Sequence, residues 1–183
     1  GELLCILHQD DRWHPSRLAR LQRLVEQHPE VAVWAHAVRF IGPAGEVLGM
    51  WRCPWPAGRP LEPAAWFPRL LVQNVLAVPG VLFRRRILAS VGAMDERRPY
   101  ATDWDFWLRM AQRHTAWVVP EPLADFRLHA ESQTLSLSRR HADFVAQLES
   151  VVADHRGDLA RLGASGRWGR MADLGVEAEL ARQ

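Results

Sequence analysis

Apolar and polar positions alternate with two different periods along the chain, and the period indicates which element each stretch forms. Continuous or alternating apolar positions predict strands at residues 2–7, 31–41 and 47–51, the last two joined by a hairpin turn. Apolar residues at helical spacing predict a helix at residues 16–28, which ends before Pro29. The N-terminal part is therefore predicted as strands around one helix.

The rest of the chain continues to mix the two kinds of element. Residues 52–63 are rich in Pro and Gly and predict a surface loop. Helices are predicted at 64–72, 84–91 and 103–113, and strands at 76–83 and 115–119. After residue 136 the pattern is helical, with interruptions near Gly157 and from 163 to 169. We therefore expect an α/β domain at residues 1–136, followed by a helical extension at 137–183.

The composition is that of an ordinary globular protein. Of the 183 residues, 48% are hydrophobic and 24% are charged, so the chain can bury a core and is not intrinsically disordered. The formal net charge of +2 argues against a nucleic-acid binder. All 23 basic residues are arginines. A GC-rich coding sequence and phosphate recognition both explain this bias, and composition alone does not choose between them.

Cysteine usage and hydropathy bear on the compartment. Cys5 and Cys53 form no metal-binding motif, and a reducing, cytoplasmic compartment suits them better than a disulfide. No apolar run reaches the ~18 residues that a membrane-spanning helix needs. The chain lacks an initiating Met and opens directly in a predicted strand, so we expect a fragment of a longer protein.

Two adjacent carboxylates, Asp10 and Asp11, come directly after the first predicted strand. Like charges side by side repel, and a divalent cation compensates this when they are buried. Mg²⁺ and Mn²⁺ prefer such oxygen ligands, and strand ends in α/β sheets are common ligand sites. The alternative is that one of the two acids caps the helix that opens near Pro15. The pair alone does not decide between a metal site and a cap.

Six segments, in order along residues 10–136, resemble motifs of family 2 glycosyltransferases. They are DDRWHPSRL, HPEV, PGVLFRR, VGAMDE, TDWDFWLR and FRLH with a following Ser132. Such enzymes have the GT-A fold. The resemblance therefore implies a mixed sheet flanked by helices, with a helical C-terminal tail. The family's N-terminal nucleotide-binding strands have no counterpart in this sequence, which would leave a sheet edge or face exposed.

The resemblance also implies a reaction. A sugar would be transferred with inversion from a nucleotide-diphosphate sugar to a carbohydrate or lipid-linked acceptor, as in bacterial polysaccharide or cell-wall synthesis, with Mn²⁺ or Mg²⁺ as cofactor. Asp11 and His129 would be metal ligands, while Asp10 and Arg127 would contact the donor. The structural alternatives are a surface position for His129 and an ion pair of Arg127 with Asp125.

The acceptor side would be formed by three further residues. Asp103 would be the general base that takes a proton from the acceptor hydroxyl. Gly80 and Trp104 would line the acceptor site, with a bulge and core packing as the respective alternatives. Asp103 could also cap its predicted helix. Asp105 is expected at the surface or in packing. The histidines other than His129, such as His155, have no partners at ligand spacing.

Two features leave room for other functions. Thr102 stands where the family often has an acid, which, together with the missing nucleotide-binding strands, favours a non-catalytic sugar-binding or scaffolding module as the alternative to an enzyme. The arginines after residue 136 could bring the chain to an anionic membrane surface, at the cytoplasmic face where lipid-linked acceptors reside. Acids in the same stretch favour a solvated pair of mixed-charge helices instead.

Overall fold

The computed structural model describes residues 1–129, 141–164 and 166–181 and shows a mixed α/β protein, as predicted. The chain divides into two compact units that interleave along the sequence. The first comprises Gly1–Leu61, Val75–Ser90 and His114–His129, and the second comprises Glu62–Asn74, Val91–Arg113 and the chain after residue 129. The boundary expected at residue 136 lies outside the described residues, so it stays a prediction.

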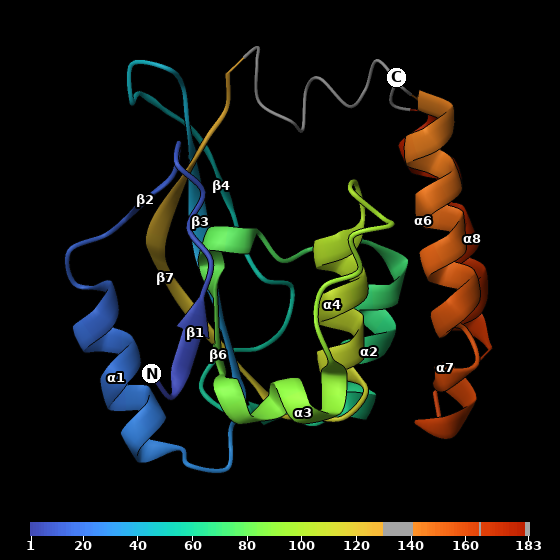
Figure 1. Ribbon diagram of the computed structural model, residues 1–183, viewed down its shortest axis with the longest axis horizontal. Helices are drawn as coiled ribbons and strands as arrows, with labels where there is room; N and C mark the ends of the chain where they lie inside the picture. Colours follow the sequence, from blue (N-terminus) through green and yellow to red (C-terminus); the bar gives the residue numbers. More distant parts are fainter. Residues whose placement is uncertain (130–140, 165, 182–183) are drawn as a thin grey trace. The chain divides into compact units, whose positions relative to one another are not determined.

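The first unit is built on a mixed sheet (Figure 1). Its strands are β1 Leu3–Cys5, β2 Arg12–Trp13, β3 Val33–Ile41, β4 Val47–Trp51, β5 Pro60–Leu61, β6 Val81–Arg84 and β7 Ala116–Arg127. They follow the order β1-β6-β3-β7-β2, with β4 paired to β3 and β5 paired to β7. The long strands β3 and β7 run parallel, whereas the other pairs are antiparallel. The hairpin predicted around residues 43–46 is confirmed as the β3–β4 connection.

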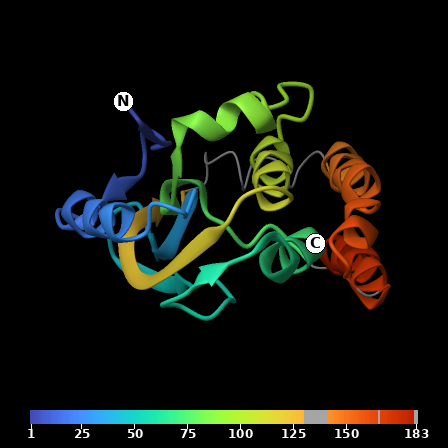
Figure 2. The same ribbon diagram turned by 90° about the horizontal axis from the view of Figure 1, so that it is seen from below.

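Helix α1, Arg17–Gln27, covers one face of this sheet (Figure 2). Leu21 and Leu24 of the helix pack in one buried cluster with Trp34 of β3 and Trp117 of β7. Residues three apart lie on the same side of a helix, which explains why these two leucines face the sheet together. The helix predicted at residues 16–28 is therefore confirmed.

Strand β7 runs further than the sequence predicts. The segment 120–122, Pro-Glu-Pro, predicts an end after Val119, yet the strand continues to Arg127. Its parallel register with β3 shifts between His36 and Val38, opposite this segment. Proline lacks an N–H donor and is tolerated in sheets at such irregularities. The prolines therefore bend the pairing without ending the strand.

The stretch from 76 to 91 is less regular than predicted. A 3₁₀ turn η1, Val78–Gly80, takes the first half of the expected strand, and a second turn η2, Arg85–Ile87, precedes the short helix α3, Leu88–Val91. Gly92 follows with a φ of +74°, a left-handed conformation that suits glycine at the end of a helix. The predicted stop at Gly92 is thus confirmed.

The second unit consists of helices. They are α2 Pro63–Val72, α4 Thr102–Ala111, α6 His141–His155, α7 Asp158–Arg161 and α8 Arg167–Ala181. Helix α2 contacts α4, α7 and α8, and α6 contacts α4 and α8. The predicted interruptions near Gly157 and Gly163 separate the last three helices, whereas α8 already includes Gly169.

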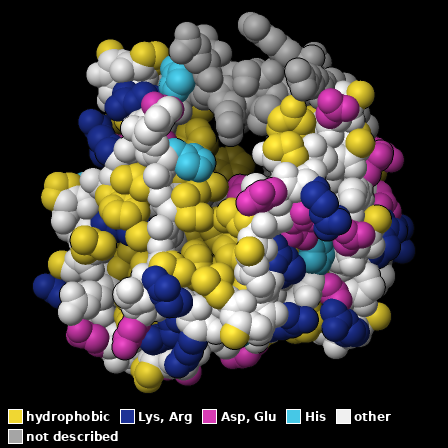
Figure 3. Space-filling model, viewed as in Figure 1, with side chains coloured by type: hydrophobic (Ala, Val, Ile, Leu, Met, Phe, Trp, Pro, Cys, Tyr) yellow, Lys and Arg dark blue, Asp and Glu magenta, His cyan; other side chains and the backbone are white. Residues whose placement is uncertain are grey.

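Some apolar side chains remain at the surface. Leu7 and Leu18 are 42% and 61% exposed. Figure 3 shows hydrophobic side chains gathered on the face of the first unit that bears β1 and β6. β1 pairs with β6 alone among the strands of the structure, so it lies at a sheet edge. No helix in the described ranges is long and apolar enough to cross a membrane.

Candidate functional site

The acidic pair lies in the connection between β1 and β2, directly before β2. The amide of Asp11 donates to the carbonyl of His8 at 3.2 Å, which forms a tight turn with Asp10 inside it. The next two residues form β2 and pair with β7, so that Arg12 lies opposite Asp125. This pairing brings the turn next to the end of β7, more than a hundred residues further along the chain.

Asp11 has one satisfied and one unsatisfied carboxylate oxygen. Its Oδ1 accepts a hydrogen bond from the backbone N–H of Arg127 at 3.0 Å. Its Oδ2 is buried and makes no hydrogen bond within the described part of the chain, and His8 Nδ1 lies 4.0 Å away. The side chain is only 3% exposed. Burial raises the pKa of Asp11 and outweighs the opposing hydrogen bond from Arg127.

Asp10 and His129 lie beside this buried carboxylate. Asp10 Oδ2 is 3.2 Å from His129 Nε2, and both side chains are partly exposed. The alternative that either acid caps the helix is wrong, because Ser16 stands at the N-cap of α1 and no side chain caps it. The sequence-predicted residues Asp10, Asp11 and His129 are therefore neighbours in space.

Arg127 holds the backbone around the acidic turn. Its Nε donates to the carbonyl of Asp10 at 3.0 Å, and its Nη1 donates to the carbonyls of Gly42 and Pro43 at 2.8 and 3.0 Å. Arg127 does not form the ion pair with Asp125 that the structural alternative predicted. Asp125 is buried and instead accepts from Arg12 and Arg39 at 2.5 and 2.6 Å. The role of Arg127 in the structure is thus to fix the turn and the end of the β3–β4 hairpin.

The side chains at the turn carry the kinds of ligand atom that a hard divalent cation binds. Two carboxylates and an imidazole are ligands that Mn²⁺ accepts, and a buried carboxylate oxygen without a hydrogen bond is the kind of atom that a cation satisfies. The described residues contain no group of three or more His, Cys, Asp or Glu side chains already arranged around a metal position. A cation held here would therefore need further oxygen ligands from a bound molecule or water.

Asp103 lies in the second unit, at the second position of α4. Its Oδ1 accepts from the backbone N–H of Trp104 at 2.7 Å, and its Oδ2 accepts from Asn74 Nδ2 at 3.0 Å. The N-cap of the helix is Ala101, so Asp103 is not the cap that the alternative predicted, although it satisfies one free N–H of the first turn. Asn74 follows α2, and the sequence around Asn74 gives no indication that its side chain contacts Asp103.

Trp104 and Gly80 are both buried, in different units. Trp104 is 3% exposed, and its indole Nε1 donates to the carbonyl of Leu70 at 2.7 Å. One face of the indole lines a cavity of about 140 Å³. A Cβ at Gly80 would lie 2.9 Å from Val38 Cγ2 and 3.0 Å from the carbonyl of His36. The close approach that this glycine permits is therefore to β3, and Gly80 ends the 3₁₀ turn η1, so it does not form the bulge that was the alternative.

Asp105 is not at the surface. It is 6% exposed and accepts from His155 Nε2 at 2.8 Å and from Arg109 Nε at 2.9 Å, with Arg98 Nη1 at 3.4 Å. Burial alone would raise the pKa of Asp105, but the hydrogen bonds and charges of His155 and Arg109 hold it below the ordinary value. His155, expected to have no partners at ligand spacing, is thus the hydrogen-bond partner of a buried carboxylate. Asp158 Oδ2 lies 3.5 Å from its other ring nitrogen.

A second buried polar pair connects α1 to the sheet. Arg17 is fully buried, donates from Nε to His36 Nε2 at 3.0 Å, and stacks over Trp13 at 4.3 Å. Burial lowers the pKa of His36 to about 4, so the ring is neutral and accepts from Arg17. Helical periodicity could not reveal this arginine, because a basic residue at a helix start is ordinarily solvated.

The sequence motifs and the site geometry have no support from comparison with known proteins. No protein-family model matches the chain, and no curated protein matches it. The case for a function therefore rests on the six motif segments and on the side-chain arrangement described above.

Proposed function

We propose that this chain is part of an inverting glycosyltransferase with a GT-A-like fold, using a nucleotide-diphosphate sugar as donor. One observation carries the proposal: within the described residues, Asp11 keeps a buried carboxylate oxygen without a hydrogen bond, beside a second carboxylate and a histidine. A purely structural aspartate in this position would be expected to have both oxygens satisfied. The turn also follows a strand of a mixed sheet, a common place for ligands in α/β proteins.

The donor side is assigned to the first unit. Asp11, Asp10 and His129 would hold Mn²⁺ or Mg²⁺. When bound, such an ion neutralises the charge of the departing nucleoside diphosphate. Arg127 keeps the turn in place through its hydrogen bonds to backbone carbonyls. The chain itself thus supplies the negatively charged side chains for the ion and a backbone turn of fixed geometry that carries them.

The acceptor side is assigned to Asp103 in the second unit. During transfer, the acceptor oxygen forms a bond to the anomeric carbon while the bond from that carbon to the diphosphate breaks. Asp103 takes the proton that the acceptor hydroxyl loses. The hydrogen bonds from Asn74 and from the N–H of Trp104 hold the carboxylate in a fixed position.

A non-catalytic sugar-binding or scaffolding module is the second candidate. Thr102 occupies the position where the family often has an acid, and its hydroxyl is buried and makes no hydrogen bond within the described residues. A degenerate copy of the enzyme would retain the fold and the acidic turn but not turnover. The two candidates differ in whether donor is consumed.

Metal-dependent nucleotide binding tests the proposal, and full-length protein is needed because the family's nucleotide-binding strands have no counterpart in this sequence, which would leave this chain inactive by itself. We expect Mn²⁺ titrated with UDP or GDP to give saturable calorimetric binding, and Asp11→Ala to abolish it. Glu26→Ala is the matched control, since Glu26 is an exposed acid on α1 in the same unit. Binding that survives in Asp11→Ala would remove the donor-site assignment.

Turnover separates the two candidates. With full-length protein we expect hydrolysis of the nucleotide-sugar donor that falls at least about a hundredfold in Asp103→Asn, the lower end for losing a general base. Metal-dependent nucleotide binding without any donor consumption would favour the non-catalytic module instead.

A further inference from the structure

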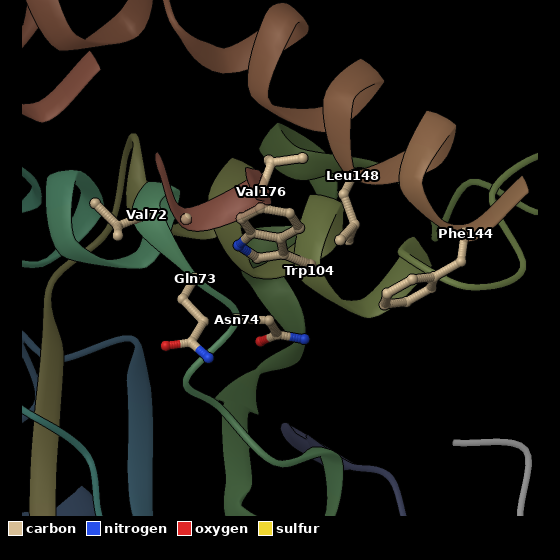
Figure 4. Close-up of a pocket in the computed structure, with 8 residues that line it drawn as sticks. Val72, Gln73, Asn74, Trp104, Phe144, Leu148 and Val176 are labelled. Atoms are coloured by element: carbon tan, nitrogen blue, oxygen red, sulfur yellow. The ribbon is translucent and has the colours of Figure 1, made fainter. Parts of the chain in front are cut away.

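The second unit contains a small cavity bounded by four helices. Its lining comes from the end of α2, from α4, from α6 and from α8 (Figure 4). The lining residues are Val72, Gln73, Asn74, Trp104, Phe144, Leu148, Gly175 and Val176. Three of these helices, α2, α6 and α8, lie outside the six motif segments, and Trp104 of α4 is the lining residue that belongs to one.

The walls of the cavity are mostly apolar. Figure 4 shows the amides of Gln73 and Asn74 together on one side of the Trp104 ring, while Phe144, Leu148 and Val176 belong to the opposite helices. The indole N–H of Trp104 already donates to Leu70, so the ring offers only its apolar surface. A sugar ring needs hydrogen-bond partners around its edge, whereas a hydrocarbon group needs none.

The cavity depends on a close helix contact. A Cβ at position 175 would collide with the carbonyl oxygen of Val72, so only glycine lets α8 approach the end of α2. Val176, the next residue on α8, then reaches the cavity wall. The space is thus a consequence of how the helices are packed.

The polar side of the cavity is connected to the proposed base. Asn74 donates to Asp103 Oδ2 at 3.0 Å, and Trp104 is the residue after Asp103. An occupant whose hydroxyl lies at this end would therefore face the residues that hold the base. The apolar remainder of such an occupant would fill the space between Trp104 and Leu148.

We propose that this cavity binds an apolar group of the acceptor, about six carbon atoms in size, whose hydroxyl end faces Asn74 and Asp103. The inference rests on the proposed function and narrows its acceptor to molecules with a hydrocarbon or aromatic portion. The volume of about 140 Å³ sets the size. Apolar cavities of roughly 150 Å³ take up benzene in other proteins.

Benzyl alcohol is a probe of this size and chemistry, and glucose is a polar comparison. On titration into the 183-residue chain, benzyl alcohol should shift the indole N–H signal of Trp104 in NMR spectra with saturation. The expected Kd is on the order of 1 mM, a value that about eight non-hydrogen atoms can reach. Glucose should leave the signal unchanged. Equal binding of glucose, or no binding of benzyl alcohol, would overturn the proposal.

Variants of the residues that line the cavity test whether benzyl alcohol binds there. Leu148→Trp fills the cavity and should raise the Kd for benzyl alcohol at least about tenfold. Ser150→Trp adds the same ring at an exposed position of α6 and should leave the Kd unchanged. Phe144→Ala enlarges the cavity and should admit naphthalene-2-methanol, which the original chain excludes. If Leu148→Trp does not fold, Phe144→Ala alone decides, because unchanged selectivity in that variant contradicts the assignment.

The outcome is independent of the donor-site test. Absence of metal-dependent nucleotide binding in the unaltered protein, with intact benzyl alcohol binding, would reject the glycosyltransferase but keep an apolar site. Intact nucleotide binding with no uptake of benzyl alcohol would reject the apolar acceptor group alone.

Discussion

Two buried aspartates, Asp11 in the first unit and Asp105 in the second, differ in how their charge is compensated. Asp105 is surrounded by His155, Arg109 and Arg98, and its pKa is held low. Asp11 receives one backbone hydrogen bond, retains an oxygen without one, and its pKa is raised. Burial alone therefore does not identify a functional acid.

The difference assigns different roles to two acids of similar burial. A carboxylate surrounded by donors is a fixed part of the structure, because removing any partner leaves a buried charge uncompensated. A carboxylate with a free oxygen keeps the capacity to bind something else, at some loss of stability. Variants of the two aspartates should therefore differ in stability and in ligand binding.

Removing Asp105 should have the largest effect. Asp105→Ala leaves His155 and Arg109 without their buried partner and should lower the free energy of unfolding by about 3–5 kcal/mol. Urea denaturation measures the loss, and hydrogen exchange should show it at the amides of α4 and α6. Glu149→Ala is the control, since Glu149 is an exposed acid on α6 in the same unit and its loss should not be measurable. An equal loss of unfolding free energy in both variants would mean that the buried network around Asp105 contributes no more to stability than an exposed acid does.

A paired aspartate in the same unit as Asp11 makes the comparison sharper. Asp125 is buried but binds Arg12 and Arg39, whose side chains are 55% and 33% exposed. Because these arginines can be solvated once released, Asp125→Ala should destabilise by only about 2 kcal/mol, measured in the same denaturation experiment. A gain in stability here would place Asp125 with Asp11 and remove the contrast within the first unit.

The sequence predicted most of what depends on local pattern. The spacing of Leu21 and Leu24 was enough for α1, and the adjacency of Asp10 and Asp11 after an apolar run was enough to select the turn. The two-residue strand β2 is too short to give a periodic pattern, yet its pairing with β7 is what brings the turn to His129.

Long-range partners could not be predicted from the sequence. His155 is fifty residues from Asp105, and neither has a neighbour in the sequence that indicates the pair. Asn74 and Asp103 are likewise joined only by the packing of α2 against α4. The continuation of β7 through its prolines depends on the register shift in β3, which is a property of the sheet.

Neutralising Asp11 should stabilise the chain. Asp11→Asn keeps an oxygen for the N–H of Arg127 but removes a buried charge, so the free energy of unfolding should rise by about 1 kcal/mol. The same variant should lose Mn²⁺-dependent nucleotide binding. A stabilised variant that still binds nucleotide would separate the buried charge from the proposed function. A destabilised one would show that Asp11 is compensated after all.

The pH dependence of stability should carry the smallest and most specific effect, because the two acids contribute with opposite sign. The pKa of Asp11 is raised above its ordinary value of 3.8, so the folded chain binds more protons there, and stability falls as pH rises from 3.8 through the raised pKa. The pKa of Asp105 lies below 3.8, so its contribution is present above that pH and is lost as pH falls through the lowered pKa. In urea titrations from pH 3 to 7, Asp11→Asn should therefore flatten the decline above pH 3.8, and Asp105→Asn should flatten the rise below it. If one variant altered both the rise in stability below pH 3.8 and the decline above it, the two carboxylates would titrate together. The contrast between them would then no longer hold.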